Sequence, residues 1–400
     1  MASRPLPLRV AGIGAGYFSQ FHLEGWRELA GVGTIELSAW CDTDPAKLKP
    51  LAQTFGVTQT FADVVTMLDT VKPDLVDIVT PPPSHAALVA LAHDRGIPVI
   101  CQKPMTPSWG ESVAMADRAA TSGVLCVIHE NFRWQPWYRE AKRLLDNGSL
   151  GTPHGVAFRV RPGDGQGPRA YLDRQPYFQR MPRLLIVETL IHWIDTVRFL
   201  LGEIDAVTAR LRKLNPVIDG EDSGILIFEF ESGTTGVVDA NRLNDHVAAN
   251  PRRTMGEMWL EGSAGVLRLD GDARLWWKPH QGSEREHGYD QGPPTFGGGC
   301  CGALQNHVIA HLASGAPIQN TASAYLANLR VQEAAYESHN TGRRIALRDY
   351  APPARPAAIS FSHEHAGLVA GAVVDAVVDD HNANHRNADN RKAINEEEAT

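Results

Sequence analysis

Short apolar runs alternate with amphipathic stretches along the first third of the chain. The apolar runs are rich in β-branched residues, as buried strands are, and cover residues 8–13, 35–41, 75–79, 98–101 and 124–129. The amphipathic stretches repeat apolar residues at helical spacing and cover residues 18–29, 45–55, 84–95 and 108–122. Ser84 and Ser108 stand at the expected N-caps of the last two helices. This alternation predicts a doubly wound parallel sheet, covered by helices on both faces, within residues 1–130.

Beyond residue 130, successive strand patterns replace that alternation. They are expected at residues 155–160, 206–213, 223–231, 234–241, 257–261, 266–270 and 275–278. Helical periodicity is found at residues 137–146, 186–201, 305–313 and 323–340. Strands that follow one another directly tend to pair in antiparallel fashion. Residues 131–350 are therefore expected to form an α+β domain with a large, mostly antiparallel sheet.

Two segments lack a regular pattern. Residues 162–182 are rich in Gly, Pro, Arg and Tyr and are too long for a simple connection, so we expect a functional loop there. An arm for contacts between subunits is the alternative. Residues 351–400 begin with prolines and end in Asn, His, Asp and Glu, a composition that buries little apolar surface. We expect a poorly ordered tail.

The charge and cysteine content of the chain exclude some classes of partner. The formal net charge is −8, and no dense Lys/Arg cluster offers a footprint for nucleic acid or an anionic membrane. No apolar run reaches the ~20 residues of a membrane span and no signal peptide is evident, so we expect a cytoplasmic protein with a small-molecule partner. The cysteines match neither a metal knuckle nor a disulfide framework. We expect free thiols and no bound metal.

A glycine-rich turn links the first expected strand to the first expected helix. Residues 14–19 form a variant of the dinucleotide-binding fingerprint, in which Gly14 permits a tight turn and Gly16 allows a pyrophosphate to approach the backbone. Ser19 replaces the third glycine and is small enough for close packing of helix on strand. Asp42, at the end of the second strand, is placed to accept hydrogen bonds from a ribose, which favours NAD over NADP. The alternatives are a tight turn in another α/β protein and, for Asp42, a turn or capping residue.

Further motifs, in order along the chain, resemble those of one family of oxidoreductases. They are Gly14-Ala15-Gly16 with His22, residues 77–85 (DIVTPPPSH), residues 101–104 (CQKP), residues 131–133 (NFR), residues 188–192 (ETLIH), Glu221-Asp222 and residues 261–265 (EGSAG). In these segments the chain resembles the Gfo/Idh/MocA family, named for glucose-fructose oxidoreductase, inositol dehydrogenase and a rhizopine catabolism protein. The resemblance implies an NAD-binding Rossmann domain, a substrate domain and assembly into a homodimer or homotetramer.

The resemblance and the fingerprint together assign cofactor contacts. The assigned residues lie in the glycine turn, at strand ends and in the loops that follow them: Gly14, Gly16, Tyr17, Phe18, Asp42, Thr80, Pro81, His85, Gln102, Lys103 and Asn131. The family's motif around the lysine is usually Glu-Lys-Pro, and Gln102 here keeps hydrogen-bonding capacity but lacks the charge. His85 is expected in the first turn of a helix, where a solvated side chain is the alternative.

The resemblance implies three catalytic residues, Lys103, Glu188 and His192. Lys103 follows a parallel strand, where open α/β sheets bind ligands, and Glu188 and His192 are four residues apart on an expected helix. Oxidation of an alcohol needs a base for the hydroxyl proton, and histidine titrates closest to neutral pH. We expect His192 to be the base, Lys103 to polarise the reacting oxygen and Glu188 to orient the substrate or the lysine. A surface Lys-Pro turn and a core histidine are the alternatives.

The resemblance implies a sugar substrate, and aromatic faces and arginine donors suit sugar rings. The expected contacts are Arg133, Tyr171, Tyr177, Glu188 and His192. A salt-bridge role is the alternative for Arg133. Residues 101–104, 129–140 and 174–178 resemble the D-apiose dehydrogenase branch of the family, which oxidises that pentose at its anomeric carbon to a lactone. The alternatives are an inositol or other polyol dehydrogenase, a non-catalytic NAD-binding sensor or scaffold, and an enzyme that recycles a tightly held cofactor.

Overall fold

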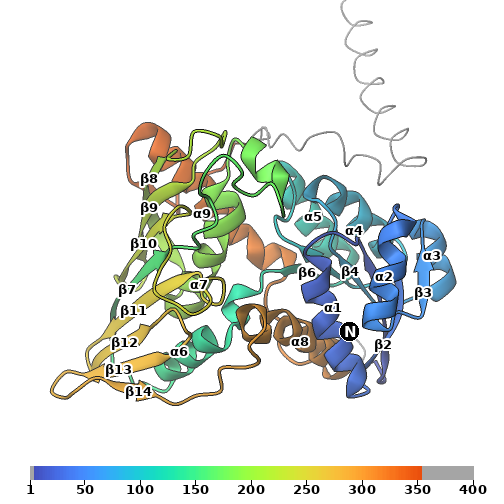
Figure 1. The fold of residues 1–400 in the computed structure, drawn as a ribbon, viewed down its shortest axis with the longest axis horizontal. Coiled ribbons are helices and arrows are strands. Elements are labelled where there is room, and N and C mark those ends of the chain that lie inside the picture. The colour runs from blue at the N-terminus through green and yellow to red at the C-terminus, as the bar shows by residue number, and fades with distance from the viewer. Residues whose placement is uncertain (1–3, 354–400) are drawn as a thin grey trace, which may run out of the picture. The chain divides into compact units, whose positions relative to one another are not determined.

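The first domain is built around a six-stranded parallel sheet. In the computed structural model, which describes residues 4–353, the strands lie in the order β3-β2-β1-β4-β5-β6 (Figure 1). They are β1 (Leu8–Ile13), β2 (Ile35–Cys41), β3 (Gln59–Phe61), β4 (Leu75–Ile78), β5 (Val99–Gln102) and β6 (Cys126–His129). The helices beside them are α1 (Ser19–Gly31), α2 (Pro45–Phe55), α3 (Val64–Val71), α4 (His85–His93) and α5 (Trp109–Ser122). The predicted doubly wound sheet is confirmed, in the strand order of a dinucleotide-binding fold.

A nine-stranded sheet forms the core of the second domain. Its order is β14-β13-β12-β11-β7-β10-β9-β8-β15, and only the β7–β10 pair is parallel among these strands. The strands are β7 (Pro153–Val160), β8 (Ile204–Arg212), β9 (Ser223–Phe230), β10 (Thr235–Asn241), β11 (Gly256–Gly262), β12 (Gly265–Leu269), β13 (Leu275–Pro279), β14 (Arg285–His287) and β15 (Ile345–Ala346). The longer helices of this part of the chain are α6 (Pro136–Asp146), α7 (Ile191–Leu201), α8 (Cys300–Ser314) and α9 (Ala322–Thr341). The predicted mostly antiparallel sheet is confirmed.

The elements that the sequence analysis missed are short. Strands β3, β14 and β15 have no fully buried residue, so they lack the apolar signal of a core strand. Helix α3 is rich in β-branched residues, which obscure helical periodicity. Single turns of helix also occur between the main elements, at η1 (Pro82–Ser84), η2 (Phe132–Trp134), η3 (Pro176–Arg180) and η5 (Phe296–Gly299).

The helix predicted over residues 186–201 begins in a different form. Its first part is a π-helix, η4 (Leu185–Leu190), which continues directly into α7. All six residues of η4 are buried. A π-helical turn is rare and is found mostly at functional sites. Glu188 lies in this turn and His192 in the first turn of α7.

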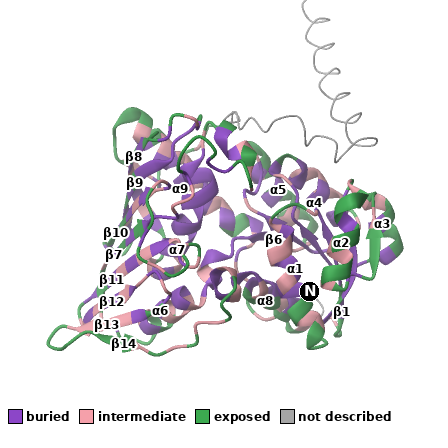
Figure 2. Ribbon diagram, in the orientation of Figure 1, coloured by how far each residue is buried: buried purple, intermediate pink, exposed green. Residues whose placement is uncertain are grey.

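Helices from the end of the described chain pack onto the first domain. Cys300 and Leu304 of α8 share an apolar core with Trp26 of α1, and Tyr325 of α9 packs into the core beside β4 and β5. Figure 2 shows buried residues running through the strands of the first sheet and along α7 and α9. The division at residue 130 stays a prediction, and α8 lies in the core of the first domain although it was assigned to the second.

Several expectations concern single residues or the chain ends. All five cysteines are free and buried thiols, as predicted. Within residues 4–353, no helix has the length and apolarity needed to cross a membrane. The tail predicted from residue 351 lies outside the described residues, apart from its first three positions.

One of the two predicted serine caps is confirmed and the other is wrong. Ser108 Oγ accepts a hydrogen bond from Glu111 N at 3.3 Å and donates to the Glu111 carboxylate at 2.9 Å. This reciprocal pattern satisfies a free N–H group at the start of α5. Ser84 makes no such bond, because its Oγ donates to Thr80 Oγ1 and the Pro81 carbonyl and its own backbone is already helical.

Replacement of the α5 cap is expected to destabilise the fold. Ser108→Ala should lower the free energy of unfolding by about 1 kcal/mol, because the Glu111 N–H loses its acceptor. Thr121→Ala, at an exposed residue in the last turn of the same helix, should change it by less than about 0.5 kcal/mol. Urea unfolding of the three proteins measures both values, and equal effects of the two substitutions would contradict the capping role.

Candidate active site

The glycine turn between β1 and α1 forms an open cradle. Gly14 has a φ of 104°, and a Cβ atom there would lie 2.8 Å from the Val79 carbonyl carbon, so only glycine fits. A Cβ atom on Gly16 would meet no atom within 4 Å, so the backbone is open on that side. Asp42 Oδ2 accepts a hydrogen bond from Ala15 N at 2.6 Å and ties the end of β2 to the turn. An open turn with an adjacent carboxylate fits the pyrophosphate and ribose of NAD.

The residues after the turn anchor helix α1. Ser19 is buried and its Oγ donates to the Gly16 carbonyl at 2.7 Å, so serine fits in place of the third glycine. Tyr17 remains 42% exposed beside the open turn. Phe18 instead packs edge-on against Phe296, with ring centroids 5.7 Å apart. Of the two aromatic residues predicted to contact the cofactor, Tyr17 is therefore the accessible one.

A buried histidine fastens the loop after β4 to the turn after β5. His85 Nε2 lies 2.8 Å from the Thr80 carbonyl oxygen, and Nδ1 lies 3.1 Å from the carbonyl oxygens of Pro104 and Met105. Its position in the first turn of α4 is confirmed, and the solvated alternative is wrong because the side chain is fully buried. Burial lowers the pKa of His85. His85 thus holds the loop that contains Thr80 and Pro81 through backbone atoms.

A second buried network lies beneath the end of β5. Asp77 Oδ2 accepts a hydrogen bond from Trp26 Nε1 at 2.6 Å and lies 2.8 Å from His22 Nδ1. His22 Nε2 lies 3.1 Å from Gln102 Nε2, and Gln102 Oε1 accepts a hydrogen bond from Lys103 N at 2.6 Å. The side chains of His22 and Asp77 are fully buried. His22 and Asp77 stand in motifs that resemble the family's, but no role was predicted for either residue.

Lys103 and Glu188 form an ion pair that joins the two domains. Lys103 Nζ donates to Glu188 Oε2 at 2.6 Å and to the Glu188 backbone carbonyl at 2.9 Å. The two side chains are 12% and 5% exposed. Tyr177 lies close enough to feel this carboxylate, since burial and then the charge of Glu188 raise the pKa of Tyr177 above its ordinary value. The carboxylate of Glu188 therefore orients the lysine, one of its two expected roles.

His192 is held by a carboxylate that the sequence analysis missed. His192 Nδ1 lies 2.6 Å from Glu130 Oε1, and the imidazole stacks on the Phe132 ring with centroids 3.9 Å apart. Glu130 is fully buried and is also within 3.5 Å of the Tyr325 hydroxyl. A carboxylate at Nδ1 requires a proton on that nitrogen, so the neutral ring carries its lone pair on Nε2. Within residues 4–353, no hydrogen-bond partner is found for His192 Nε2.

The strand register brings these two pairs to one end of the first sheet. Gln102 pairs with His129 across the parallel strands β5 and β6, so the residues that follow, Lys103 and Glu130, leave the sheet side by side. Their partners, Glu188 and His192, lie four positions apart where η4 passes into α7. The amine and the imidazole therefore belong to one site. The position of Glu130 at a strand end is the signal that could have identified it.

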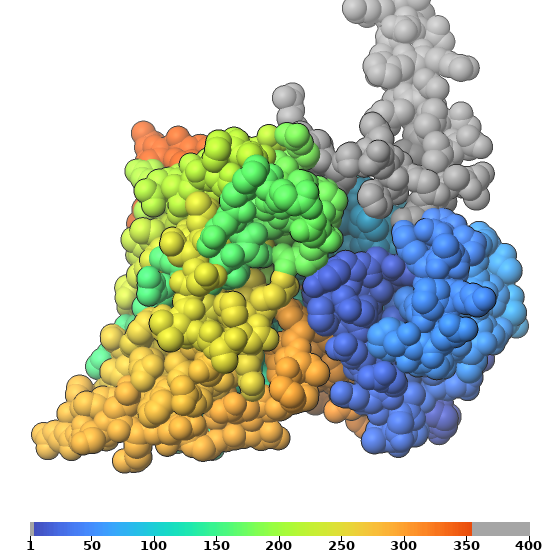
Figure 3. All heavy atoms as spheres, in the orientation of Figure 1, coloured from blue at the N-terminus to red at the C-terminus, as the bar shows by residue number. Residues whose placement is uncertain are grey.

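Residues 162–182 form a compact wall beside this site. Asp164 Oδ2 accepts hydrogen bonds from Arg174 at 2.6 Å and from Arg242 at 2.7 Å. Arg242 is 4% exposed and also donates to Thr189 Oγ1 at 2.6 Å, next to Glu188. These contacts fix the segment to the π-helical turn. The Arg174 guanidinium lies 5.9 Å from the centre of the Tyr17 ring. Figure 3 shows green atoms from the middle of the chain next to dark blue atoms from its N-terminal part.

The two tyrosines of the wall differ in position. Tyr171 belongs to a small apolar cluster with Phe178, and its hydroxyl is buried without a hydrogen-bond partner among the described residues. The Arg242 guanidinium lies 4.8 Å from the centre of its ring. Tyr171 is therefore part of the interior of the wall, and the predicted sugar contact would require that interior to open. Tyr177 also packs edge-on against Phe178, with ring centroids 4.9 Å apart, and lies near Glu188.

Two predicted site residues have other partners. Arg133 donates to Asp195 through two nitrogens at 2.7 and 2.6 Å, so the salt-bridge alternative accounts for its position. Asn131 Nδ2 donates to the sulfur atoms of Cys301 at 3.1 Å and Cys300 at 3.3 Å on α8. Asp195 lies on α7, the helix that also carries His192, and the two cysteines lie in the first turn of α8. The side chains of Arg133 and Asn131 are therefore both bound to other residues of the protein.

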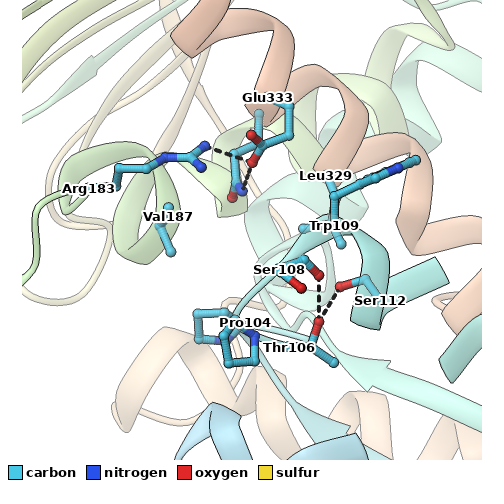
Figure 4. Close-up of a pocket in the computed structure, with 11 residues that line it drawn as sticks. Pro104, Thr106, Ser108, Trp109, Ser112, Arg183, Val187, Leu329 and Glu333 are labelled. Carbon is cyan, nitrogen blue, oxygen red and sulfur yellow. Dashed lines mark hydrogen bonds and ion pairs between the residues drawn. The ribbon is translucent and has the colours of Figure 1, made fainter. Parts of the chain in front are cut away.

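A narrow recess lies behind the lysine turn. Figure 4 shows its wall, made by residues of the turn, of α5, of η4 and of α9: Pro104, Thr106, Pro107, Ser108, Trp109, Ser112, Arg183, Val187, Leu329, Gln332 and Glu333. Arg183 donates to Glu333 at 2.7 Å across it. Neither Lys103 nor His192 lines the recess. The recess therefore does not hold the reacting groups.

Comparisons with known proteins identify a family of oxidoreductases. Residues 8–130 match the family model described as oxidoreductase family, NAD-binding Rossmann fold, and residues 138–268 match the GFO/IDH/MocA C-terminal domain. A D-apiose dehydrogenase from Paraburkholderia graminis is 34% identical over 361 residues, which are 88% of this chain and 92% of that protein. A D-apiose dehydrogenase from Rhizobium rhizogenes is 30% identical, over 84% of this chain and 97% of that protein.

A solved structure extends the comparison to the fold. An oxidoreductase from Agrobacterium radiobacter, crystallised with NAD+, L-tartaric acid and magnesium, has a TM-score of 0.76 and 29% sequence identity. The match covers 85% of this chain and 98% of that one. Both domains, the glycine turn and the strand-end lysine thus have one explanation: the chain belongs to the Gfo/Idh/MocA family of NAD-binding oxidoreductases.

Proposed function

We propose that this protein is an NAD-dependent sugar dehydrogenase that oxidises D-apiose at its anomeric carbon to the lactone. The observation that carries the proposal is the pairing of Lys103 with Glu188 and of His192 with Glu130 at one end of the sheet. The choice of sugar is supported by the two D-apiose dehydrogenases, which are 34% and 30% identical over most of the chain. The site therefore supports the class of reaction, and the similarity to the two relatives supports the choice of substrate.

The cofactor would lie along the ends of β1, β2, β4 and β5. The open turn at Gly16 would receive the pyrophosphate, Asp42 the adenosine ribose, and the loop of Thr80 and Pro81 the nicotinamide side. Bound NAD supplies the acceptor for the hydride that leaves the sugar carbon. Gln102 and His85 bind the neighbouring backbone at Lys103 and Thr80, so they would contribute to cofactor binding by positioning these two loops.

His192 would accept the proton of the sugar hydroxyl. The Glu130 carboxylate keeps the proton on Nδ1 and leaves Nε2 as the base, while the Phe132 ring fixes the plane of the imidazole. As the hydroxyl proton moves to Nε2, the imidazole becomes positively charged. The buried carboxylate of Glu130 then stabilises that charge, because the two groups are already in contact.

Lys103 would donate a hydrogen bond to the same oxygen. Its ammonium group has three protons, and the two bonds to Glu188 leave one for a substrate. A cation beside the oxygen favours loss of its proton to His192. The hydroxyl proton thus moves to the histidine, the C–H electron pair goes to the cofactor, and the anomeric carbon becomes the lactone carbonyl. Tyr177 and Glu188 would contact the remaining hydroxyls.

A polyol substrate is the second candidate. A scyllo-inositol 2-dehydrogenase from Bacillus subtilis is 28% identical over 65% of this chain and 75% of that protein. The same pair of base and cation would oxidise a ring hydroxyl to a ketone. The His192–Glu130 pair sets which nitrogen of the imidazole carries the proton. A non-catalytic sensor would not require that arrangement, so the pair favours an enzyme.

The open face of the second sheet would form a contact between subunits. Along β9, Leu226 and Phe228 are fully buried, whereas Ile225 and Ile227 are 46% and 43% exposed on the opposite face. Val237 of the neighbouring strand β10 is 36% exposed beside Ile227. A contiguous apolar patch of this kind is a common dimer interface.

A charge placed on that face is expected to break the assembly. Ile227→Glu should shift the mass measured by light scattering towards the 43.6 kDa of one chain. Val32→Glu, at an equally apolar residue that is 75% exposed on the first domain, should leave the mass unchanged. A wild-type protein that is already monomeric at micromolar concentration would refute the interface.

The substrate is tested by reduction of NAD on a panel of sugars. We expect kcat/KM for D-apiose to exceed that for myo-inositol, scyllo-inositol and common aldoses by about 10-fold or more, since a site that hydrogen-bonds each hydroxyl rejects a misplaced one. The readout is the absorbance of NADH at 340 nm. Faster turnover of an inositol would select the second candidate, and no turnover of any sugar would favour the sensor.

The catalytic pairs make distinct kinetic predictions. His192→Ala, Lys103→Ala and Glu130→Gln should each lower kcat by about 100-fold or more, because each removes the base, the cation or the carboxylate that fixes the base. NADH affinity, measured by fluorescence titration, should stay within about threefold of wild type. Tyr325→Phe serves as the control, since its hydroxyl is 3.5 Å from Glu130 and adds little. Near-normal turnover of Glu130→Gln would exclude the tautomer role.

Cofactor binding can be tested without any sugar. Asp42→Ala should raise the Kd for NADH by about 10-fold or more, because the ribose loses a carboxylate and the glycine turn loses its bond to Asp42. Asp44→Ala, two residues further on, removes only the N-cap of α2 and should leave the Kd unchanged. Equal Kd values for wild type and Asp42→Ala would show that the ribose lies elsewhere.

A further inference from the structure

The glutamine beside the catalytic lysine makes two hydrogen bonds whose directions are linked. A backbone N–H is always a donor, so the Lys103 N–H requires the oxygen of the Gln102 amide, Oε1, at 2.6 Å. The Gln102 NH2 group must then point to the other side, where it meets His22 Nε2 at 3.1 Å. The NH2 group has no lone pair to offer. His22 Nε2 must therefore be the acceptor.

This requirement fixes the protonation of His22. With Nε2 as an acceptor, the ring is neutral and carries its proton on Nδ1, where the Asp77 carboxylate accepts it at 2.8 Å. A doubly protonated ring would place an N–H group against the Gln102 NH2 group. His22 and Asp77 are fully buried and Gln102 is 7% exposed, so water cannot relieve that clash.

We propose that Gln102 is a positioning residue that keeps His22 neutral and links this state to the placement of Lys103. Protonation of His22 would force the Gln102 amide to turn over and present its NH2 group to the Lys103 N–H. The bond to Lys103 and a proton on His22 Nε2 are thus mutually exclusive. The protonation state of the buried His22 therefore determines whether the backbone N–H of Lys103 keeps its hydrogen bond to Gln102.

The other groups around His22 do not remove this constraint. Burial lowers the pKa of His22, but the charge and hydrogen bond of Asp77 outweigh burial and pull the pKa above its ordinary value. Cys301 of α8 also favours protonation, whereas the His129 ring, stacked on His22 at 3.8 Å, is held neutral by its own burial. The amide of Gln102 opposes Asp77. We infer that the effect of the Gln102 amide prevails and that His22 stays neutral, because two N–H groups that face each other at 3.1 Å would both lack an acceptor.

The consequence for catalysis depends on the proposed role of Lys103. Its Nζ reaches Glu188 from a backbone that Gln102 fixes, so loss of the Gln102 bond would loosen the ion pair between the domains. The protonation of His22 itself does not depend on that role. It can be measured with neither sugar nor cofactor, so a failure of this inference is distinguishable from a failure of the proposed function.

The direct test is the protonation state of His22 in the wild-type protein. Nuclear magnetic resonance of protein labelled with 15N-histidine reports each ring nitrogen, and the His22 signals are those absent from a His22→Asn variant. We expect a neutral ring with its proton on Nδ1 from pH 6 to pH 8.5. A His22 ring that is doubly protonated at pH 7.5 would overturn the proposal.

A pair of variants supplies an independent test. Gln102→Glu offers an acceptor to both neighbours, so the folded variant takes up one additional proton between the new carboxylate and His22. That proton is bound more tightly in the folded than in the unfolded chain, so the stability it provides is lost as pH rises. The unfolding constant of Gln102→Glu relative to wild type should therefore increase about 10-fold per pH unit between pH 6 and pH 8.

The matched control removes the hydrogen bonds without adding an acceptor. Gln102→Met has a similar size, and its unfolding constant relative to wild type should vary much less with pH than that of Gln102→Glu. If His22 of the wild type were already doubly protonated, it would pair with the new carboxylate without uptake of a further proton, and both variants would show the same pH dependence. That result, measured by urea unfolding, would refute the proposal.

Discussion

The contact between the Lys103 ammonium and the Glu188 carboxylate is the interaction on which the rest of the site depends. It joins the end of a strand in the first domain to a π-helical turn in the second, at 2.6 Å and with little exposure to water. A buried charge without a partner is costly, so each group holds the other in its place. The position of His192, four residues beyond Glu188, follows from the same contact.

The same constraint organises the groups around this pair. Several buried basic side chains of the region have a carboxylate from another part of the chain: His192 has Glu130, Arg242 has Asp164, and Arg133 has Asp195. These pairs tie the strand ends of the first sheet, the wall of residues 162–182 and helix α7 together. A site built in this way is rigid before any ligand arrives, so little further ordering is needed when a substrate binds.

The fold could be predicted from the sequence because its strands and helices are long and their apolar periodicity is clear. Lys103 and His192 could be predicted as site residues because they occur in motifs with family spacing. The position of Glu130 at a strand end makes it a candidate, but its role could not be predicted, since that role depends on the register of β5 and β6, which brings it beside Lys103. Periodicity within one segment carries no information on such a pairing.

Other residues show the limits of reading side chains from a sequence. Tyr171 and Arg133 have the chemistry expected of sugar contacts, but one packs inside the wall and the other binds Asp195. Serine is a common helix N-cap, but the Ser84 hydroxyl forms hydrogen bonds with Thr80 and Pro81 instead. In each case a partner distant in sequence, or a local turn, decides the role. Residue type alone restricts the candidates and does not choose among them.

The central claim is that Lys103 and His192 act on one and the same hydroxyl group. A crystal structure of the protein with NADH and the sugar that it oxidises would test this most directly. The account predicts Lys103 Nζ and His192 Nε2 within about 3.2 Å of a single sugar oxygen, with Glu130 still bound to Nδ1. A complex in which the two nitrogens contact different hydroxyl groups, or in which Lys103 contacts Glu188 alone, would contradict it.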